Sequence, residues 1–235
     1  MDLKESDILG ADIGRHWYYR SKARAIAQTL AGFEAQRILD VGAGSGFFSR
    51  YLLAHTGARE AWCVDISYEA DSDRCEAGKA VYYRRAVEQL DADLVLLMDV
   101  LEHVDDDRGL LRDYAAKVPA GSRFLITVPA FQWLWSGHDV FLEHRRRYTL
   151  GQLESVVSDA GLRVIGGHYY FGAVLPLAAM LRLVQRLRGP QPPSSQLTRH
   201  GSLSNSLLSG VCRVELPFMC RNRVGGLSVF CLAEK

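Results

Sequence analysis

The sequence predicts an α/β fold, with a doubly wound, mostly parallel sheet of seven strands. Three observations support this prediction. Short apolar runs alternate with segments whose apolar residues recur at helical spacing, which indicates strand–helix–strand units joined by right-handed crossovers. A glycine-rich turn separates the first strand from the helix after it. Residues 93–98 form a nearly continuous apolar run, as expected for a parallel strand that is covered on both faces.

Residues 37–48, RILDVGAGSGFF, predict a strand, a turn and the start of a helix. The turn has glycines at alternate positions, Gly42, Gly44 and Gly46. Because glycine has no Cβ, the backbone can approach a ligand closely, and the first N–H groups of the helix stay available. Asp65 closes the next apolar run, 25 positions after Asp40, where an acid is placed to bind two ribose hydroxyls. Together these features predict a nucleoside-cofactor site.

The third glycine comes one residue too early for the dinucleotide fingerprint G-x-G-x-x-G. In the form LDVGAGSG, the stretch resembles motif I of the class I S-adenosylmethionine-dependent methyltransferases. Residues 93–104, DLVLLMDVLEHV, look like the fourth strand of that superfamily and the turn after it. The two matches cover about the first 130 residues. This resemblance implies a Rossmann-like methyltransferase fold with S-adenosylmethionine as its cofactor.

The resemblance also implies which residues bind the cofactor. In the family, the first acid and the glycines hold the methionine part, the second acid holds the ribose, and residues of the fourth strand border the cofactor. Carried over by position, the expected cofactor-binding residues are Asp40, Gly42, Ala43, Gly44, Gly46, Asp65, Ile66, Met98 and Asp99.

Residues 1–35 precede the first strand and contain an amphipathic helical pattern after the aromatic segment HWYYR, residues 16–20. This segment is either a helix that covers one edge of the sheet or a lid, because many relatives carry a similar HWW- or HWY-type segment near the cofactor mouth. The predicted organisation is an N-terminal helical lid (1–35), an α/β core that binds the cofactor (36–170), a helical insertion (171–223) and the final strand of the core (224–235).

The stretch after the fifth strand, residues 129–148, brings together two Trp, two His and three Arg. It resembles a subgroup of bacterial class I methyltransferases with the pattern PA…LWS.HD…H.RRYT, in which this loop is expected to build the acceptor pocket. The expected substrate-binding residues are Trp135, Asp139, Arg147 and Tyr148. Alternatively, Arg146, Arg147 and Tyr148 only anchor the loop to the next helix, which Thr149 would cap.

Methyl transfer requires alignment of the reacting atoms and exclusion of water, and a hydroxyl acceptor also benefits from a general base. Histidine suits that role through its pKa near neutrality, so the candidate catalytic residues are His103, His138 and His144. His103 could instead hold the turn after the fourth strand. No metal is expected, because the two loop histidines lack helical i, i+4 spacing and the methyl donor needs none.

Residues 171–223 separate the last two strands by far more than a hairpin loop. They are apolar and basic, with seven Arg and one acidic residue, whereas the whole chain has a net charge of +1. Three interpretations stand: an interfacial helix that meets a membrane or captures a lipid-like acceptor, a homodimer interface, and a helical cap over the site. A Pro/Gln/Ser stretch at 189–196 indicates a linker inside the insertion.

The sequence therefore favours an S-adenosylmethionine-dependent methyltransferase that acts on oxygen of a small-molecule or lipid-like acceptor. The alternative is a cofactor-binding sensor or partner subunit without transferase activity, and a nicotinamide oxidoreductase ranks third. Nucleic acid is not an expected partner, because the basic surplus lies in an apolar insertion. Without a signal peptide pattern, a long apolar run or paired CxxC cysteines, the expected location is cytoplasmic, peripheral to the inner membrane face if the insertion binds lipid.

Overall fold

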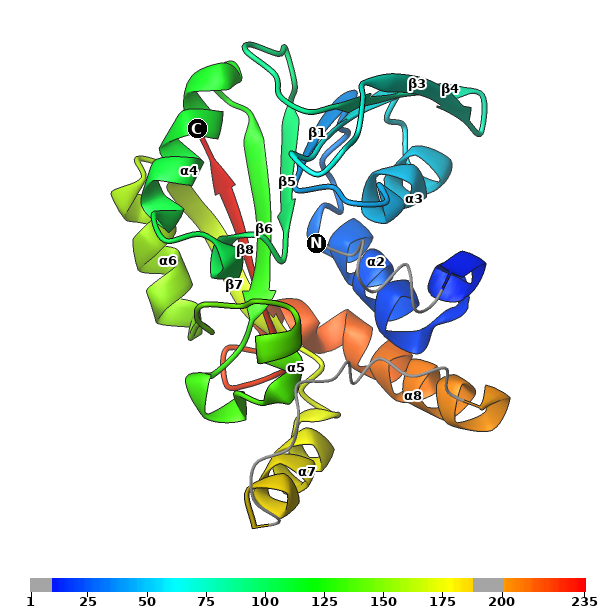
Figure 1. Ribbon diagram of the computed structural model, residues 1–235, viewed down its shortest axis with the longest axis vertical. Helices are drawn as coiled ribbons and strands as arrows, with labels where there is room; N and C mark the ends of the chain where they lie inside the picture. The colour runs from blue at the N-terminus through cyan, green and yellow to red at the C-terminus, as the bar shows by residue number, and fades with distance from the viewer. Residues whose placement is uncertain (1–9, 188–200) are drawn as a thin grey trace.

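The computed structural model describes residues 10–187 and 201–235. Its centre is one sheet with the strand order β3-β4-β2-β1-β5-β6-β8-β7 (Figure 1). The strands are β1 (Arg37–Val41), β2 (Glu60–Val64), β3 (Ser72–Glu76), β4 (Lys79–Arg84), β5 (Leu94–Met98), β6 (Arg123–Pro129), β7 (Arg163–Tyr170) and β8 (Ser228–Glu234). Strands β4, β2, β1, β5 and β6 pair in parallel, while β3, β7 and β8 pair antiparallel with their neighbours. The predicted doubly wound, mostly parallel sheet is confirmed.

The sheet has eight strands rather than the seven predicted, because the polar segment Ser72–Glu76 forms the additional strand β3. Strand β3 forms a hairpin with β4 through Ala77 and Gly78, whose φ angles of 51° and 76° suit a tight hairpin turn. Most residues of β3 are exposed. An edge strand that is solvated on both faces has no apolar alternation, which is why the sequence pattern did not indicate it.

Helices cover both faces of the sheet (Figure 1). One face packs against α2 (Trp17–Thr29) and α3 (Phe47–His55), and the other packs against α4 (Asp107–Lys117) and α6 (Leu150–Asp159). The remaining short helices are η1 (Gly10–Arg15), η2 (Leu101–His103), η3 (Gln132–Leu134), α5 (Gly137–Phe141) and η4 (Leu216–Arg221). In β5, alternate side chains enter the two apolar layers, since successive residues of a strand point to opposite faces.

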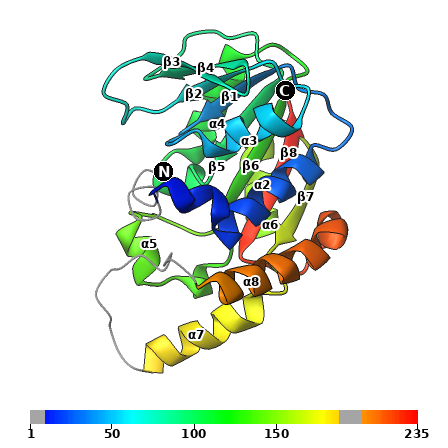
Figure 2. The same cartoon turned by 90° about the vertical axis from the view of Figure 1, so that its right-hand side faces the viewer.

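The insertion between β7 and β8 contains α7 (Leu175–Leu187) and α8 (Ser202–Glu215). Helix α8 packs beside α2, where the Asn205 side chain accepts a hydrogen bond from the Trp17 N–H at 2.7 Å and donates one to the Arg15 carbonyl at 2.9 Å (Figure 2). Helix α7 projects away from the sheet and has no buried residue. The predicted helical insertion is confirmed, and the predicted linker at 189–196 lies outside the described residues.

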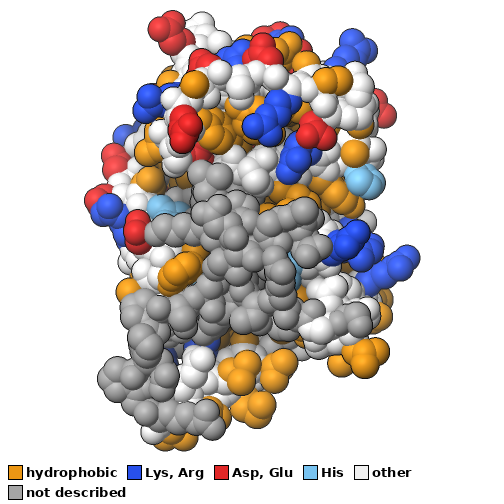
Figure 3. Space-filling model, turned by 45° about the vertical axis from the view of Figure 1, so that its right-hand side comes forward, with side chains coloured by type: hydrophobic (Ala, Val, Ile, Leu, Met, Phe, Trp, Pro, Cys, Tyr) orange, Lys and Arg blue, Asp and Glu red, His pale blue; other side chains and the backbone are white. Residues whose placement is uncertain are grey.

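Apolar side chains gather on the lower part of the molecule in Figure 3, the level at which α7 lies in Figure 1. The exposed apolar side chains of the two insertion helices include Leu183, Leu187, Leu203 and Leu207. Within the described ranges, no helix combines the length and the apolar character that crossing a bilayer would require.

The carboxyl ends of the central parallel strands meet at one edge of the sheet, where ligands bind in open α/β sheets. Val41 leads into the glycine-rich turn, Val64 into Asp65, and Met98 into Asp99. Gly42, Gly44 and Gly46 all have φ between 52° and 71°, a region that favours glycine. The fold therefore places the glycine-rich turn and both following acids around one opening.

Candidate active site

A cavity of about 420 Å³ opens beside the glycine-rich turn. It is bordered by the residues that follow β1, β2 and β5, including Gly42, Asp65 and Asp99. A Cβ atom on Gly42 would lie 2.8 Å from the Val100 side chain, so the turn leaves no room for a side chain at this point. The wall of the cavity is thus formed partly by bare backbone.

Asp65 organises the glycine-rich turn. Its carboxylate accepts hydrogen bonds from the N–H groups of Gly44 at 3.0 Å and Ser67 at 2.9 Å. Burial alone would raise the pKa of Asp65, but the hydrogen bonds from Ser67 and Gly44 lower it below the ordinary value. Asp65 is therefore ionised at neutral pH and borders the cavity, as an acceptor for hydroxyl donors must be.

Asp40 lies behind the turn rather than in the cavity. It is 2% exposed and accepts a hydrogen bond from the Ser49 hydroxyl of α3. Tyr68 donates its hydroxyl to the Gly44 carbonyl at 2.7 Å. The turn is thus supported from both sides, by α3 and by the segment after β2.

Asp99 stands between two cavities, because it lines both the one beside the glycine-rich turn and a second one of about 440 Å³. Its φ of 56° is rare for a residue other than glycine. Its carboxylate pairs with the Lys22 ammonium and accepts hydrogen bonds from Thr127 at 3.1 Å and Tyr18 at 3.5 Å. Leu142 also borders both cavities, so the two spaces share a wall.

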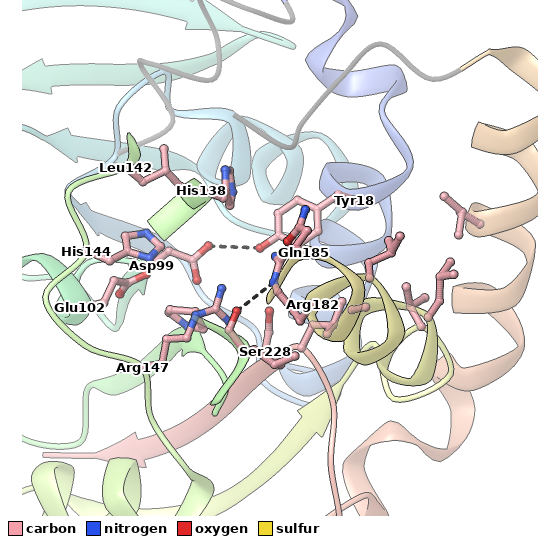
Figure 4. A pocket seen from close by; sticks show the side chains of 18 of the residues that line it. Tyr18, Asp99, Glu102, His138, Leu142, His144, Arg147, Arg182, Gln185 and Ser228 are labelled. Atoms are coloured by element: carbon pink, nitrogen blue, oxygen red, sulfur yellow. Dashed lines mark hydrogen bonds between the residues drawn. The ribbon is translucent and has the colours of Figure 1, made fainter. Parts of the chain in front are cut away.

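The second cavity has a polar side and an apolar side. In Figure 4, the side chains of Asp99, Glu102, His144 and Arg147 lie together, across the cavity from Arg182 and Gln185 of α7. The apolar side includes residues of α7 and α8, namely Leu177, Ala178, Leu181 and Leu208. An amphiphilic molecule would match this division.

Asp139 is fully buried and orients two of its neighbours. Its carboxylate accepts hydrogen bonds from His144 Nδ1 at 3.0 Å, from Arg147 Nε at 2.6 Å and from the Ser136 N–H at 2.8 Å. Burial opposes ionisation, but the hydrogen bonds from His144 and Arg147 hold the pKa of Asp139 well below its ordinary value. Because the ionised Asp139 accepts a hydrogen bond at Nδ1, it favours the imidazole tautomer of His144 that carries its proton on Nδ1 and its lone pair on Nε2.

The Methyltransferase domain family matches residues 15–166 of the chain, which is more than half of its length. The chain belongs to this family. The curated ubiquinone biosynthesis O-methyltransferase of Parvibaculum lavamentivorans is 32% identical over 165 residues, which cover 59% of this chain and 63% of that protein. The chain thus spans less than two thirds of the length of this curated relative.

Solved structures of low sequence identity share the fold of this methyltransferase-domain protein. A S-adenosylmethionine-dependent methyltransferase from Archaeoglobus fulgidus has a TM-score of 0.56 and 17% identity, over 99% of this chain and 98% of that one. A chain of a Haloferax volcanii complex between a methyltransferase and its activator has a TM-score of 0.59 and 16% identity, over 99% and 95% of the two chains. These likenesses confirm the predicted methyltransferase fold.

The methyltransferase domain brings some of the predicted site residues to the cavities and keeps others behind them. Gly42, Asp65, Ile66, Asp99 and His103 line the cavity beside the turn, and Asp99, His138, His144 and Arg147 line the second cavity. The cofactor-site candidates that line neither cavity are Asp40, Ala43, Gly44, Gly46 and Met98, which form the buried strand ends and the body of the turn.

Three residues predicted to bind substrate, Trp135, Asp139 and Tyr148, do not line either of these two cavities. The Tyr148 hydroxyl donates to Asp107 at 2.9 Å and Leu101 O at 3.2 Å, so Tyr148 anchors the loop. Asp139 is occupied by its buried hydrogen bonds. The Trp135 side chain lines neither space. Thr149 caps α6 as predicted, with Gln152 completing the capping box.

Two residues of this methyltransferase-domain chain were missed by the sequence reasoning. Lys22 is fully buried, because Asp99 offsets the cost of burial and raises its pKa. Glu102 is also fully buried and lines the second cavity. Its carboxyl group lies with the ring nitrogens of His103 and His144 in a group whose atoms are within 4.8 Å of one another. The apolar helical face shared by Lys22 and Ile26 was the available signal for Lys22.

Proposed function

We propose that the protein is a S-adenosylmethionine-dependent methyltransferase that methylates oxygen of a small-molecule or lipid-like acceptor. The observation behind this proposal is the common wall of the two cavities at Asp99 and Leu142. One cavity adjoins the glycine-rich turn and the other contains the oriented His144. A cofactor and an acceptor bound in these cavities would meet at the shared wall, which supports direct transfer between them.

The residues around the first cavity suit a nucleoside cofactor. In this proposal, the ionised Asp65 accepts the ribose hydroxyls, Ile66 packs beside the base, and the backbone at Gly42 contacts the amino-acid part. Ile66 is 84% exposed and so is available for such packing. Asp40, Ala43, Gly44, Gly46 and Met98 hold the turn that makes these contacts, and Asp99 borders the methyl group. When bound, S-adenosylmethionine supplies an electrophilic methyl group.

His144 is the proposed general base. His144 lines the second cavity, and the ionised Asp139 would stabilise the imidazolium that forms when Nε2 takes the hydroxyl proton of the acceptor. Burial lowers the pKa of His138 and of His103 to about 4, so both rings are neutral and weakly basic at neutral pH. His138 and His103 therefore shape the site, while His144 moves the proton.

The acceptor proposed here has an apolar part that lies against α7 and α8. We propose that residues 10–35, the described part of the predicted 1–35 lid, cover the acceptor cavity, because Trp17 and Tyr18 of α2 line it. The 36–170 segment and the strand at 224–235 form the core. The basic and apolar 171–223 insertion is proposed to contact an anionic membrane surface at the inner face, which favours lipid-like acceptors over a homodimer role for the same helices.

The name of the curated relative supports oxygen as the methylated atom. The alternative function, a cofactor-binding sensor or partner subunit, predicts the same cofactor site without turnover. Two experiments distinguish the transferase from the sensor. First, S-adenosylmethionine, NAD and NADP are titrated calorimetrically into wild type and Asp65→Ala. Second, the release of S-adenosylhomocysteine is assayed with lipid extracts as the source of acceptor. Binding of S-adenosylmethionine that Asp65→Ala weakens, followed by product release, supports the transferase. Binding without turnover supports the sensor, and preference for NAD contradicts both.

A further inference from the structure

Glu102 lines the acceptor cavity, and both of its carboxyl oxygens are buried. The residue lies in η2, directly after β5, and is 0% exposed. Neither of its carboxyl oxygens has a hydrogen-bond partner within the described part of the chain. Its backbone carbonyl, by contrast, accepts a hydrogen bond from the Arg145 N–H at 2.7 Å, which fixes η2 against the loop that contains His144. The main chain is thus well held, while the buried carboxyl group still lacks a hydrogen-bond partner among the described residues.

Nε2 of His144 is in the same situation. It is buried, has no hydrogen-bond partner among the described residues, and belongs to a side chain that is 5% exposed. A ring nitrogen of His144 and a carboxyl oxygen of Glu102 lie within 4.8 Å of each other. One oxygen atom placed between them would be within hydrogen-bond distance of both, since O–H···O and N–H···O bonds span about 2.7–3.0 Å.

We propose that Glu102 is a catalytic residue, whose carboxyl group and the Nε2 atom of His144 together hold the hydroxyl oxygen that is methylated. This inference rests on the proposed function and names the atoms that bind its acceptor. A hydroxyl group satisfies both partners at once, because it can donate to His144 and accept from a protonated Glu102. Two buried polar atoms that would otherwise stay unpaired are thereby satisfied.

The surroundings of Glu102 favour its protonated form. Burial, followed by the neighbouring charge of Asp99, raises the pKa of Glu102 well above its ordinary value. The ammonium group of Lys22 in α2 and the Arg147 guanidinium act in the opposite direction. Lys22 is engaged by Asp99, and Arg147 is engaged by Asp139. The facing ring of His103 is neutral at neutral pH.

In the reaction, Glu102 keeps its proton and positions the oxygen, while His144 accepts the hydroxyl proton. A lone pair of the oxygen forms the bond to the methyl carbon, the carbon–sulfur bond breaks, and its electron pair stays on sulfur. The positive charge passes from the sulfonium to the His144 imidazolium, which lies against the Asp139 carboxylate. Charge and protons balance without any further reactant.

The test uses 4-nitrophenol as a hydroxyl probe, because its visible absorbance distinguishes the phenol from the phenolate. The full chain is titrated with the probe over a pH series, without cofactor, in wild type, Glu102→Leu, Glu102→Gln and His144→Gln. Glu34→Gln serves as the matched control, since Glu34 is exposed and precedes β1, at the opposite end of that strand from the glycine-rich turn. Circular dichroism confirms that each variant is folded, and S-adenosylmethionine affinity is measured in parallel.

Wild type and Glu34→Gln are expected to bind the probe and to ionise it at a lower pH than free probe. His144→Gln should abolish that shift, and Glu102→Leu should weaken the affinity about tenfold or more, because a hydrogen bond to the probe is lost. Glu102→Gln keeps a hydrogen-bond donor at this position, so it should bind the probe about as tightly as wild type does at neutral pH. At higher pH, wild type should bind the probe more weakly because Glu102 ionises, whereas Glu102→Gln should show no such decrease.

Three results would overturn the proposal. Glu102→Leu could bind the probe as wild type does. Glu102→Leu and Glu102→Gln could lose S-adenosylmethionine affinity in step with probe affinity, which would make Glu102 structural. Probe binding could disappear after dialysis against EDTA and return with Zn²⁺, which would make the group a cation site. If wild type does not bind S-adenosylmethionine, the proposed function is contradicted. The binding of the probe is measured without cofactor, so it still tests the role of Glu102 separately.

Discussion

The ammonium group of Lys22 pairs with the carboxylate of Asp99, a residue 77 positions later in the chain. Lys22 is fully buried in α2, and Asp99 borders both cavities at the end of β5. The pair therefore joins α2 to the wall that the two cavities share. Tyr18, one turn before Lys22, reaches the same carboxylate and stacks on Phe171.

Replacing Lys22 with methionine should lower the free energy of unfolding by about 3–5 kcal/mol, because the Asp99 charge would lose its buried partner. Urea denaturation followed by circular dichroism measures this change. The control is Lys117→Met, which removes an i, i+4 pair with Asp113 on the surface and should cost less than about 1 kcal/mol. Equal effects of the two variants would argue against a structural role for the Lys22–Asp99 pair.

Asp139→Asn should reduce turnover by about 10²–10⁴-fold, because the amide no longer fixes the His144 tautomer or stabilises the imidazolium. Affinity for S-adenosylmethionine, measured by calorimetry, should stay close to that of wild type. Asp73→Asn, on the exposed strand β3, provides a control with the same chemical change. A parallel fall in turnover and cofactor affinity would show that Asp139 only maintains the fold.

Gly42→Ala should weaken cofactor binding and destabilise the fold. The added Cβ would lie 2.8 Å from Val100, and the φ of 64° is strained for alanine. Gly151→Ala is the matched control, because Gly151 lies in α6, has open space around its Cβ position and should gain stability from the better helix former. Thermal melts with and without S-adenosylmethionine measure both effects, and an unchanged ligand-induced shift in Gly42→Ala would contradict the expected close approach.

Stability should fall as the pH drops from about 6.5 toward 4, because His168 is buried and uncharged. Burial lowers the pKa of His168 to about 4, so the unfolded chain binds its proton first and acid favours unfolding. The ring stacks on Phe230, and Nε2 lies 3.4 Å from the Thr29 hydroxyl. Urea midpoints across this pH range should decline less steeply in His168→Gln than in wild type. Identical slopes would mean that other groups cause the decline.

The protein should sediment with vesicles that contain phosphatidylglycerol and much less with vesicles of phosphatidylcholine alone, because the insertion combines exposed apolar side chains with arginine. The double variant Leu183→Glu/Leu187→Glu on α7 should lose this binding. Val224→Glu changes an apolar residue outside both helices that is more exposed than Leu183 or Leu187, and it should retain vesicle binding. Sedimentation that does not depend on lipid charge would argue against binding to an anionic membrane surface. A concentration-dependent dimer that the α7 variant abolishes would favour a homodimer interface instead.

The parts of the fold that sequence could predict are those with a local cause. Strand β1 and its turn were predictable because an apolar run, an acid and three glycines are contiguous. Strand β3 was not, since its pairing with β4 is the main reason for its extended form. Lys22 and Glu102 are polar residues whose burial depends on elements far along the chain. The orienting role of Asp139 depends on how α5 folds back toward His144 and Arg147.

The insertion begins after β7 and returns at β8, and these two strands pair directly with each other along the sheet. Helices α7 and α8 therefore begin and end at neighbouring points on one sheet edge, while they supply four apolar residues of the proposed acceptor cavity. Exchange of this segment between relatives would alter which molecules fit without disturbing the register of any central strand. The wall of the proposed acceptor cavity and the glycine-rich turn are therefore separate parts of the fold, and each can be altered without the other.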